Sequence, residues 1–231
     1  MKHLLSCSIL SADFARLGEE TASVIAAGVD SVHFDVMDNH YVPNLSIGPM
    51  VLRSLRDYGI TAPIEVHLMV SPVDEIIPEF ARAGASIIAF HPETSANINK
   101  ALTLIKQHDC QAGLVLNPDT PVDKIQSFIS QLDVIVLMSV CPGFGGQSFL
   151  PRTFLKIRQI RKLINSLGYN NIALEVDGGV NVNNIRAIAT SGADILVIGS
   201  AIFSQSKNNY KQVINSMRAE LSKYRAINLP N

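Results

Sequence analysis

Charge and cysteine are both scarce in this sequence. Charged residues make up 17% of the chain and its formal net charge is -1, which provides no basic surface for nucleic acid or an anionic membrane. The three cysteines, Cys7, Cys110 and Cys141, show neither CxxC nor zinc-knuckle spacing. A disulfide framework is therefore not expected, and a reducing compartment is indicated. We expect neither nucleic acid nor a membrane among its partners.

Long apolar runs are also absent. The longest, such as VIVLMSV at 134–140, are far shorter than the roughly 20 residues that a membrane span needs. The first residues, MKHLLSC, resemble the start of a lipoprotein signal, but the apolar pair Leu4 and Leu5 falls far short of a signal h-region. A soluble, cytoplasmic protein is the expectation.

Short β-branched runs alternate with amphipathic stretches along the chain, which is the pattern of repeated βα units and a parallel sheet. No linker, low-complexity tract or charge block divides the 231 residues, so we expect one domain over 1–231. Strands are predicted at 4–10, 31–36, 63–69, 86–90, 111–116, 134–139, 172–176 and 195–199.

Eight such units fit a (β/α)8 barrel, the TIM barrel, although a doubly wound open sheet would share most of these local signals. Pro49 and Pro121 are predicted to open helices. Gly28, Gly84 and Gly192 each stand just before a predicted strand, as C-terminal helix caps do. The placement of the polar residues favours the barrel, because barrel enzymes carry their chemistry at the C-terminal ends of the strands.

Histidine and aspartate occupy those strand ends. In SVHFDVMDNHYVPN, residues 31–44, His33 and Asp35 share one face because strand side chains alternate. His67 in EVHLM and Asp177 at the end of the seventh strand have the same placement. Two imidazoles and two carboxylates can bind a divalent metal, zinc most commonly, with iron, manganese or cobalt as alternatives. For His33 and Asp35 alone, a buried ion pair without metal is the alternative.

Glycine-rich loops follow the last three predicted strands. They are CPGFGGQSF at 141–149, DGGV at 177–180 and GSAIF at 199–203. Glycine lets backbone N–H groups approach an anion closely, so three such loops predict a phosphate-binding site, with ordinary turns as the alternative.

The sequence lacks the residues that several other reaction classes require. None of the nine lysines lies within a predicted strand, so no Schiff base is expected inside the barrel. No serine nucleophile elbow and no GxGxxG after a strand is present. Met37, Met69 and Met138 end three strands; they either fill the core or form a dry wall beside reacting carbons. His91, Cys7 and His40, near the same rim, are expected to pack or to lie behind the ligands.

Five motifs together resemble the ribulose-phosphate 3-epimerase family, in the same order and over nearly the whole chain. They are SVHFDVMDNHYVPNLSIGP, EVHLMV, SVCPGFGGQSF, EVDGGVN and GSAIF. The resemblance implies a (β/α)8 barrel of the ribulose-phosphate-binding type and a homo-oligomer. It also implies interconversion of D-ribulose 5-phosphate and D-xylulose 5-phosphate, in the pentose phosphate pathway and carbon fixation, by proton transfer between two carboxylates through a metal-stabilised ene-diolate.

The resemblance also implies roles for particular residues. His33, Asp35, His67 and Asp177 would bind one divalent metal, with Asp35 and Asp177 as the acid and base. Cys141 departs from the asparagine usual in the family, which puts one polar contact beside the loop in doubt. The residues implied to bind substrate are Ser8, His67, Gly143, Phe144, Gly145, Gly146, Asp177, Gly178, Gly179, Gly199 and Ser200, and those implied to wall the intermediate are Met37, Met69 and Met138.

Three alternatives stay open at this point. An epimerase for a six-carbon substrate such as D-allulose 6-phosphate would use the same machinery in a roomier pocket. A lyase on the same barrel, an aldolase or a decarboxylase, is disfavoured because the decarboxylase pattern Asp-x-Lys-x-x-Asp has Met37 at its lysine position. A non-catalytic protein that binds metal and phosphate is the third.

Overall fold

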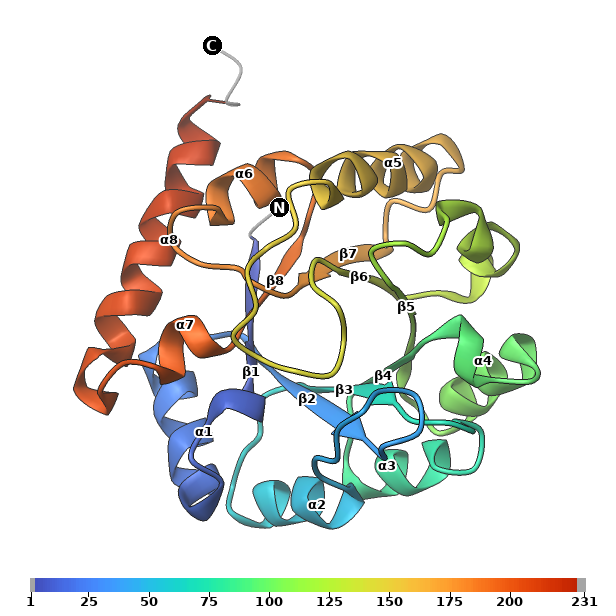
Figure 1. Cartoon of the computed structure of the whole chain (residues 1–231), viewed down its shortest axis with the longest axis horizontal. Helices are drawn as coiled ribbons and strands as arrows, with labels where there is room; N and C mark the ends of the chain where they lie inside the picture. The colour runs from blue at the N-terminus through green and yellow to red at the C-terminus, as the bar shows by residue number, and fades with distance from the viewer. Residues whose placement is uncertain (1–2, 228–231) are drawn as a thin grey trace.

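The computed structural model, which describes residues 3–227, is a closed barrel of parallel strands surrounded by helices (Figure 1). Each strand pairs with the next in sequence, and β1 pairs with β8 through Leu4 and Ile195, so the sheet has no free edge. This closure confirms the predicted (β/α)8 barrel and excludes the doubly wound sheet. The strands are β1 (Leu4–Ser8), β2 (Ser31–Met37), β3 (Ile64–Met69), β4 (Ile87–Phe90), β5 (Gln111–Leu116), β6 (Val134–Met138), β7 (Ala173–Asp177) and β8 (Ile195–Ile198).

Helices connect the strands on the outside of the barrel. The connection between β5 and β6 is a 3₁₀ helix, Val122–Gln131, rather than an α-helix. The α-helices are α1 (Leu17–Ala27), α2 (Pro49–Asp57), α3 (Ile77–Ala83), α4 (Ile98–Gln107), α5 (Thr153–Ser166), α6 (Ile185–Thr190), α7 (Ser200–Phe203) and α8 (Tyr210–Ile227), and the shorter 3₁₀ helices are Ile9–Ser11, Phe14–Arg16, Pro92–Thr94 and Lys207–Asn209.

The predicted helix boundaries have clear local causes. Pro49 is the first residue of α2, where its missing N–H costs no hydrogen bond. Gly28 and Gly84 follow α1 and α3 with φ of 115° and 105°, a left-handed conformation that only glycine adopts readily. Gly192, with φ of 121°, follows the end of α6. Pro121 precedes the 3₁₀ helix between β5 and β6.

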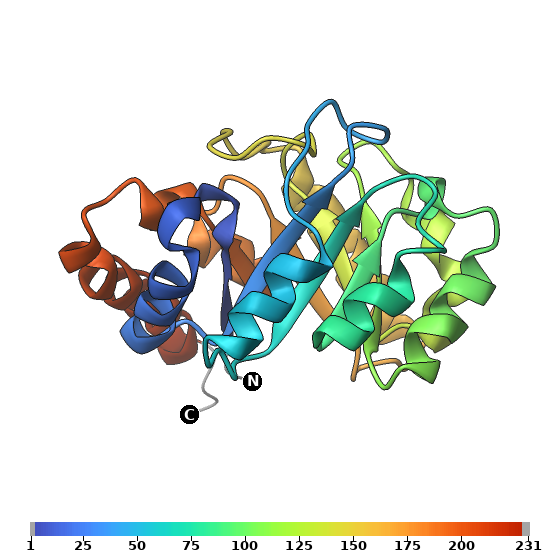
Figure 2. The same ribbon diagram turned by 90° about the horizontal axis from the view of Figure 1, so that it is seen from below.

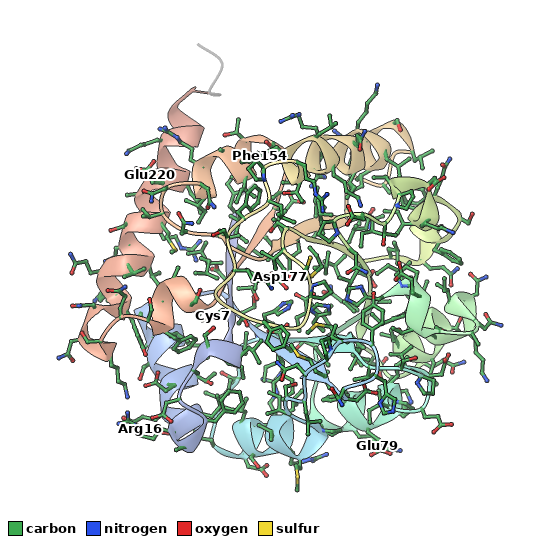
Figure 3. The ribbon with its side chains drawn as sticks, in the orientation of Figure 1. Cys7, Arg16, Glu79, Phe154, Asp177 and Glu220 are labelled. Carbon is green, nitrogen blue, oxygen red and sulfur yellow. The ribbon has the colours of Figure 1, made fainter. Side chains whose placement is uncertain are left out.

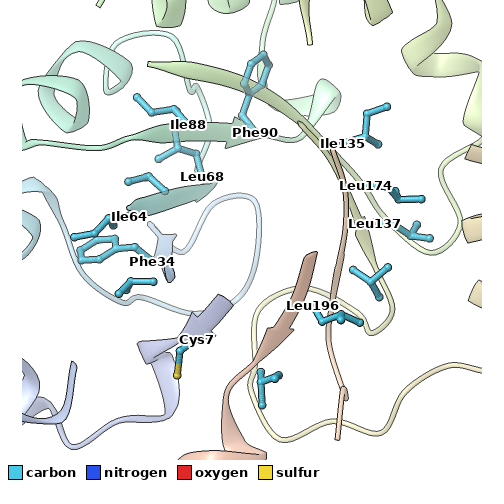
Figure 4. Close-up of a cluster of buried hydrophobic side chains, with 14 of the residues drawn as sticks. Cys7, Phe34, Ile64, Leu68, Ile88, Phe90, Ile135, Leu137, Leu174 and Leu196 are labelled. Carbon is cyan, nitrogen blue, oxygen red and sulfur yellow. The ribbon is translucent and has the colours of Figure 1, made fainter. Parts of the chain in front are cut away.

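The main hydrophobic core lies between the barrel wall and the helices. Residues on the outer faces of the strands, such as Phe34, Leu68 and Phe90, are fully buried there (Figure 4). Because side chains alternate along a strand, the residues between them point into the barrel. Each strand therefore contributes one face to packing and the other to the barrel interior.

The barrel interior is apolar on one side and polar on the other. Strands β4, β5 and β6 contribute an apolar cluster that includes Ala89, Val115 and Val136. Strands β2, β3 and β7 instead contribute histidine and carboxylate side chains that are at most slightly exposed. A polar side with so little exposure is unusual in a protein core, and it ends at the rim where the loops gather.

The predicted domain spans 1–231, and residues 1–2 and 228–231 of that range lie outside the described residues. Within the described range, no helix combines the length and apolar character that a bilayer crossing requires.

Candidate active site

The loops after β2 and β6 rise from the same end of the barrel, the end at which the strands finish (Figure 2). The loop after β6 also crosses the barrel mouth (Figure 1). A cavity of about 350 Å³ lies at this end. Predicted site residues that line it are Ser8, Asp35, Met37, Met69, Met138, Gly143, Phe144, Gly145, Gly146, Asp177, Gly178, Gly179, Gly199 and Ser200.

Strand register brings the polar side chains together. Asp35 on β2 is paired with His67 on β3, and His33 lies one inward-facing position below Asp35. Asp177 ends β7, beside Met138 of β6. Side chains that are far apart in sequence thereby meet at the centre of the barrel, where Figure 3 shows Asp177.

Four ligand atoms from these residues lie within 4.8 Å of one another. Nε2 of His33 lies 3.3 Å from Oδ1 of Asp35 and 3.6 Å from Oδ2 of Asp177. Nδ1 of His67 lies 3.2 Å from the same Asp35 oxygen and 3.8 Å from the same Asp177 oxygen. The two histidine nitrogens are 3.3 Å apart.

These separations fit a tetrahedral metal site. Ligand atoms bound at the usual zinc distances stand about 3.4 Å apart along the edges of a tetrahedron. The five separations given above run from 3.2 to 3.8 Å. The nitrogen and oxygen donors are also those that zinc, iron, manganese and cobalt accept. The residues present therefore fit a divalent metal ion.

The charge of the cluster points the same way. Four carboxylates lie in or beside it, because Glu65 and Glu175 are buried next to Nδ1 of His33, at 3.8 and 3.1 Å. Among the described side chains, which end at Lys223, no lysine or arginine forms an ion pair with any of the four. Carboxylates buried close together repel one another, and a bound metal ion would offset that repulsion.

The two aspartates have opposite pKa shifts. Burial raises the pKa of Asp35, but the charges and hydrogen bonds of His33 and His67 outweigh burial and bring it well below its usual value. Burial also raises the pKa of Asp177, and there the opposing effect of His33 is too small to reverse it. Burial lowers the pKa of His33, but Asp35 and Asp177 outweigh it and hold this imidazole protonated above its ordinary range.

The two oxygens of Asp35 face different partners. Oδ1 faces the two histidines, whereas Oδ2 accepts a hydrogen bond of 2.6 Å from the hydroxyl of Ser8. Ser8 and Asp35 both line the cavity. Oδ1 is therefore available to bind a metal, while Oδ2 lies beside Ser8 at the cavity.

The glycines of the loops are required by close backbone packing. Gly178 and Gly179 have φ of 117° and 66°. A Cβ at Gly179 would lie 2.7 Å from Cα of Phe149, so only glycine fits between these two loops. Ser139 fixes the same region, because its hydroxyl donates to the carbonyls of Asp177 and Gly178 at 2.9 and 2.6 Å.

The loop after β6 is held across the mouth by the loop after β2. The side-chain amide of Asn44 donates to the carbonyl of Gly143 at 2.7 Å. Within the loop, Gln147 donates to the carbonyls of Cys141 and Phe144 at 2.7 and 2.8 Å. The Cys141 side chain itself is exposed at the cavity rim.

Two predicted residues lie deeper than the cavity. His33 and His67 are fully buried and do not line it, so a direct contact of His67 with a sugar stays a prediction.

Cys7 packs in the outer hydrophobic core, as predicted. The expectation of packing is wrong for His40, whose side chain is 73% exposed and contacts neighbouring Asp38.

Several residues at the C-terminal end of the barrel were not predicted from the sequence. Glu65 and Glu175 were not identified as site residues, although each lies two positions before a predicted ligand, which places it on the same strand face. Ser11 and Asn181 also line the cavity. Both lie in connections, where no periodic pattern indicates which way a side chain points.

Fold and site together define a (β/α)8 barrel enzyme with a carboxylate pair and a set of donors that could hold a metal ion at the catalytic end of the barrel. Residues 4–203 match the family described as ribulose-phosphate 3 epimerase. The chain belongs to this family.

Individual proteins support the same assignment. The chain is 64% identical over 222 residues to ribulose-phosphate 3-epimerase of Escherichia coli (strain K12), covering 96% of this chain and 97% of that one. It is 58% identical over 220 residues to the protein of the same name from Buchnera aphidicola subsp. Acyrthosiphon pisum, covering 95% of each. Among solved structures, KGPDC from Streptococcus mutans matches with a TM-score of 0.72 at 13% identity, covering 97% and 99% of the chains, a likeness of fold alone.

Proposed function

We propose that this protein interconverts D-ribulose 5-phosphate and D-xylulose 5-phosphate by moving a proton at C3, with Asp35 and Asp177 as acid and base. The observation that carries this proposal is the meeting of these two carboxylates beside the cavity, each with one oxygen toward the same pair of histidines. Family membership supports the reaction class.

Inversion at C3 needs two proton-transfer groups on opposite faces of the carbon. One carboxylate removes the proton next to the C2 ketone, and the other delivers a proton to the opposite face of the resulting ene-diolate. Asp35 and Asp177 come from β2 and β7, which β1 and β8 separate in the barrel, so the two carboxylates approach the cavity from different strands. In the reverse reaction the two residues exchange roles.

The two carboxylates would serve alternately. Each acts as the base for one epimer and as the acid for the other, so Asp35 removes the C3 proton in one direction of the reaction and Asp177 removes it in the other.

The four clustered side chains would hold the metal ion. A divalent ion bound by His33, Asp35, His67 and Asp177 would act as a Lewis acid toward the negative charge that develops on the substrate oxygens. Ser8, through its hydrogen bond to Oδ2 of Asp35, fixes the orientation of the carboxylate that moves the proton. Zinc fits the donor set best, with iron, manganese and cobalt as alternatives.

The glycine loops would bind the phosphate. Gly146, Gly179 and Gly199 line the same cavity as the carboxylates, from the loops after β6, β7 and β8, the usual place for phosphate in such barrels. Binding energy from the phosphate would hold C3 between Asp35 and Asp177. Met37, Met69 and Met138, all nearly fully buried at the cavity wall, would shield the intermediate from water.

Substrate comparison tests this proposal. We expect the metal-loaded protein to convert D-ribulose 5-phosphate with a kcat/KM at least about tenfold above that for D-allulose 6-phosphate, since one added carbon typically changes discrimination by this order. Carbon-13 NMR of each substrate follows the conversion directly. A preference for the six-carbon substrate would show that the substrate is a hexulose phosphate instead of a pentulose phosphate. Conversion of neither substrate would contradict the epimerase activity.

We expect the active protein to be a cytoplasmic homo-oligomer.

A further inference from the structure

The second nitrogen of His67 points away from the metal-binding cluster. Nδ1 of this buried ring faces Asp35, whereas Nε2 lies 2.9 Å from Nε2 of His91. A neutral imidazole that binds a cation through one nitrogen carries its proton on the other. If Nδ1 of His67 binds the metal, Nε2 therefore carries a proton that needs an acceptor.

His91 is the hydrogen-bond partner of that nitrogen in the described part of the chain. Its ring is fully buried and lies 5.1 Å from the ring of His67, tilted by 36°. A hydrogen bond between two neutral imidazoles needs one donor and one acceptor, so the tautomer of either ring fixes that of the other.

The position of His91 does not depend on His67. His91 directly follows β4, and its carbonyl accepts hydrogen bonds from the backbone N–H and the hydroxyl of Thr94 at 3.0 and 2.8 Å. Its ring also packs against Tyr41, with centroids 4.7 Å apart, and the hydroxyl of Tyr41 accepts a hydrogen bond from Asn117. Contacts other than the one with His67 therefore hold His91 in position.

We propose that His91 is a positioning residue for the metal centre: its Nε2 accepts the Nε2 proton of His67 and leaves Nδ1 of His67 to bind the cation. The proposal rests on the metal site of the proposed function. In the metal-bound protein, His91 consequently carries its own proton on Nδ1. Partners that orient a metal-binding histidine in this way typically change metal affinity by about 10- to 100-fold.

Two substitutions separate this role from simple packing. His91→Phe keeps the ring beside Tyr41 but removes the acceptor, and His91→Gln places an amide oxygen within reach of His67. We would measure the Kd for Zn²⁺ of wild type and both variants, as full-length proteins, by competition with a chelator. Thermal unfolding of each protein without metal serves as the control for folding.

We expect His91→Phe to bind Zn²⁺ about 10- to 100-fold more weakly than wild type, and His91→Gln to stay close to wild type. Wild-type affinity in a folded His91→Phe protein would overturn the proposal while leaving the metal site intact. Absence of Zn²⁺ binding by wild type would instead contradict the metal site itself, and the role of His91 with it.

Nitrogen-15 NMR of the imidazoles gives an independent test that needs no substitution. In the Zn²⁺-loaded wild-type protein we expect the proton of His67 on Nε2 and that of His91 on Nδ1. A proton on Nδ1 of His67 would overturn the proposal even if His91→Phe does not fold.

Discussion

The two carboxylate oxygens of Asp35 contact different side chains. His33 and His67 lie near Oδ1, and Ser8 donates to Oδ2. The two histidines also make the ionised form favourable, which burial alone would oppose. A carboxylate in this setting can contribute to a metal site and still exchange a proton on its other side.

Replacing either aspartate should remove the reaction rather than the fold. We expect Asp35→Asn and Asp177→Asn each to lower kcat by about 10³-fold or more, because an amide does not exchange the proton and proton-transfer groups contribute about 10²- to 10⁴-fold. Asp119→Asn, which removes a carboxylate that is 77% exposed and paired with Arg152, is the matched control. Conversion of D-ribulose 5-phosphate gives kcat; near-normal turnover in either site variant would remove that residue from the mechanism.

Cys7 provides a test at alkaline pH. Its fully buried thiol has a pKa raised above the ordinary 9.0, because burial outweighs the opposing effect of His33. The folded state therefore keeps a proton that the unfolded chain releases, so the stability linked to this thiol is complete below pH 9 and is lost as pH rises further. Between pH 8 and 10, wild type should lose about 1.4 kcal/mol relative to Cys7→Ala.

Urea unfolding at pH 8, 9 and 10 measures this difference. Cys141→Ala, which removes an exposed thiol, should follow wild type across the same range. A constant difference between wild type and Cys7→Ala would show that the thiol does not titrate differently in the two states.

Single residues were predictable where the period of a strand fixed their direction. His33, Asp35, His67 and Asp177 follow from alternation and from their place at strand ends, and the structure brings them together. His91 and Asn44 act on partners in other units of the barrel. Such contacts depend on register and on the path of a connection, neither of which a local pattern contains.

At the scale of elements, the strands and most helices followed from the sequence. The predicted strand at 4–10 ends early, because the chain turns into the 3₁₀ helix Ile9–Ser11 directly after Ser8. The turn places Ser11 at the cavity wall. The unit after β5 forms a 3₁₀ helix instead of an α-helix; we have no physical account of this difference.

The loop after β7 should tolerate a side chain poorly. Gly168 and Gly179 both have positive φ, 79° and 66°, but a Cβ at Gly168 meets nothing, whereas one at Gly179 meets the backbone of Ser148 and Phe149. We expect Gly168→Ala to cost about 1–2 kcal/mol for its backbone conformation. Gly179→Ala should cost about 1–3 kcal/mol more through overpacking and should also raise KM.

Urea unfolding and steady-state kinetics of the two variants provide the comparison. Equal costs for Gly168→Ala and Gly179→Ala would mean that the loops separate easily. An unchanged KM in Gly179→Ala would argue against a substrate contact at this loop.

At the scale of the whole molecule, the polar side of the barrel interior links stability to metal binding. Several carboxylates are buried there beside histidines. A ligand that binds only the folded state, and is present at a concentration 100 times its Kd, stabilises the folded state by about 2.7 kcal/mol. For a chain of this size that corresponds to a rise in Tm of about 5–10 °C.

Thermal unfolding with Zn²⁺ and with a chelator measures this rise. His67→Gln should lose most of it, whereas His40→Gln, at an exposed histidine, should keep it. An equal rise in Tm with Zn²⁺ in both variants would show that the metal binds elsewhere. In the wild-type protein, the same chelator should also abolish turnover.

The central claim is that Asp35 and Asp177 move a proton at C3 of a pentulose phosphate. Proton NMR of D-ribulose 5-phosphate in deuterium oxide, with the metal-loaded protein, tests it most directly. We predict that deuterium appears at C3 as D-xylulose 5-phosphate forms, and that Asp35→Asn and Asp177→Asn each slow both by about 10³-fold or more. Formation of D-xylulose 5-phosphate without deuterium at C3, or no change with any divalent metal, would contradict the account.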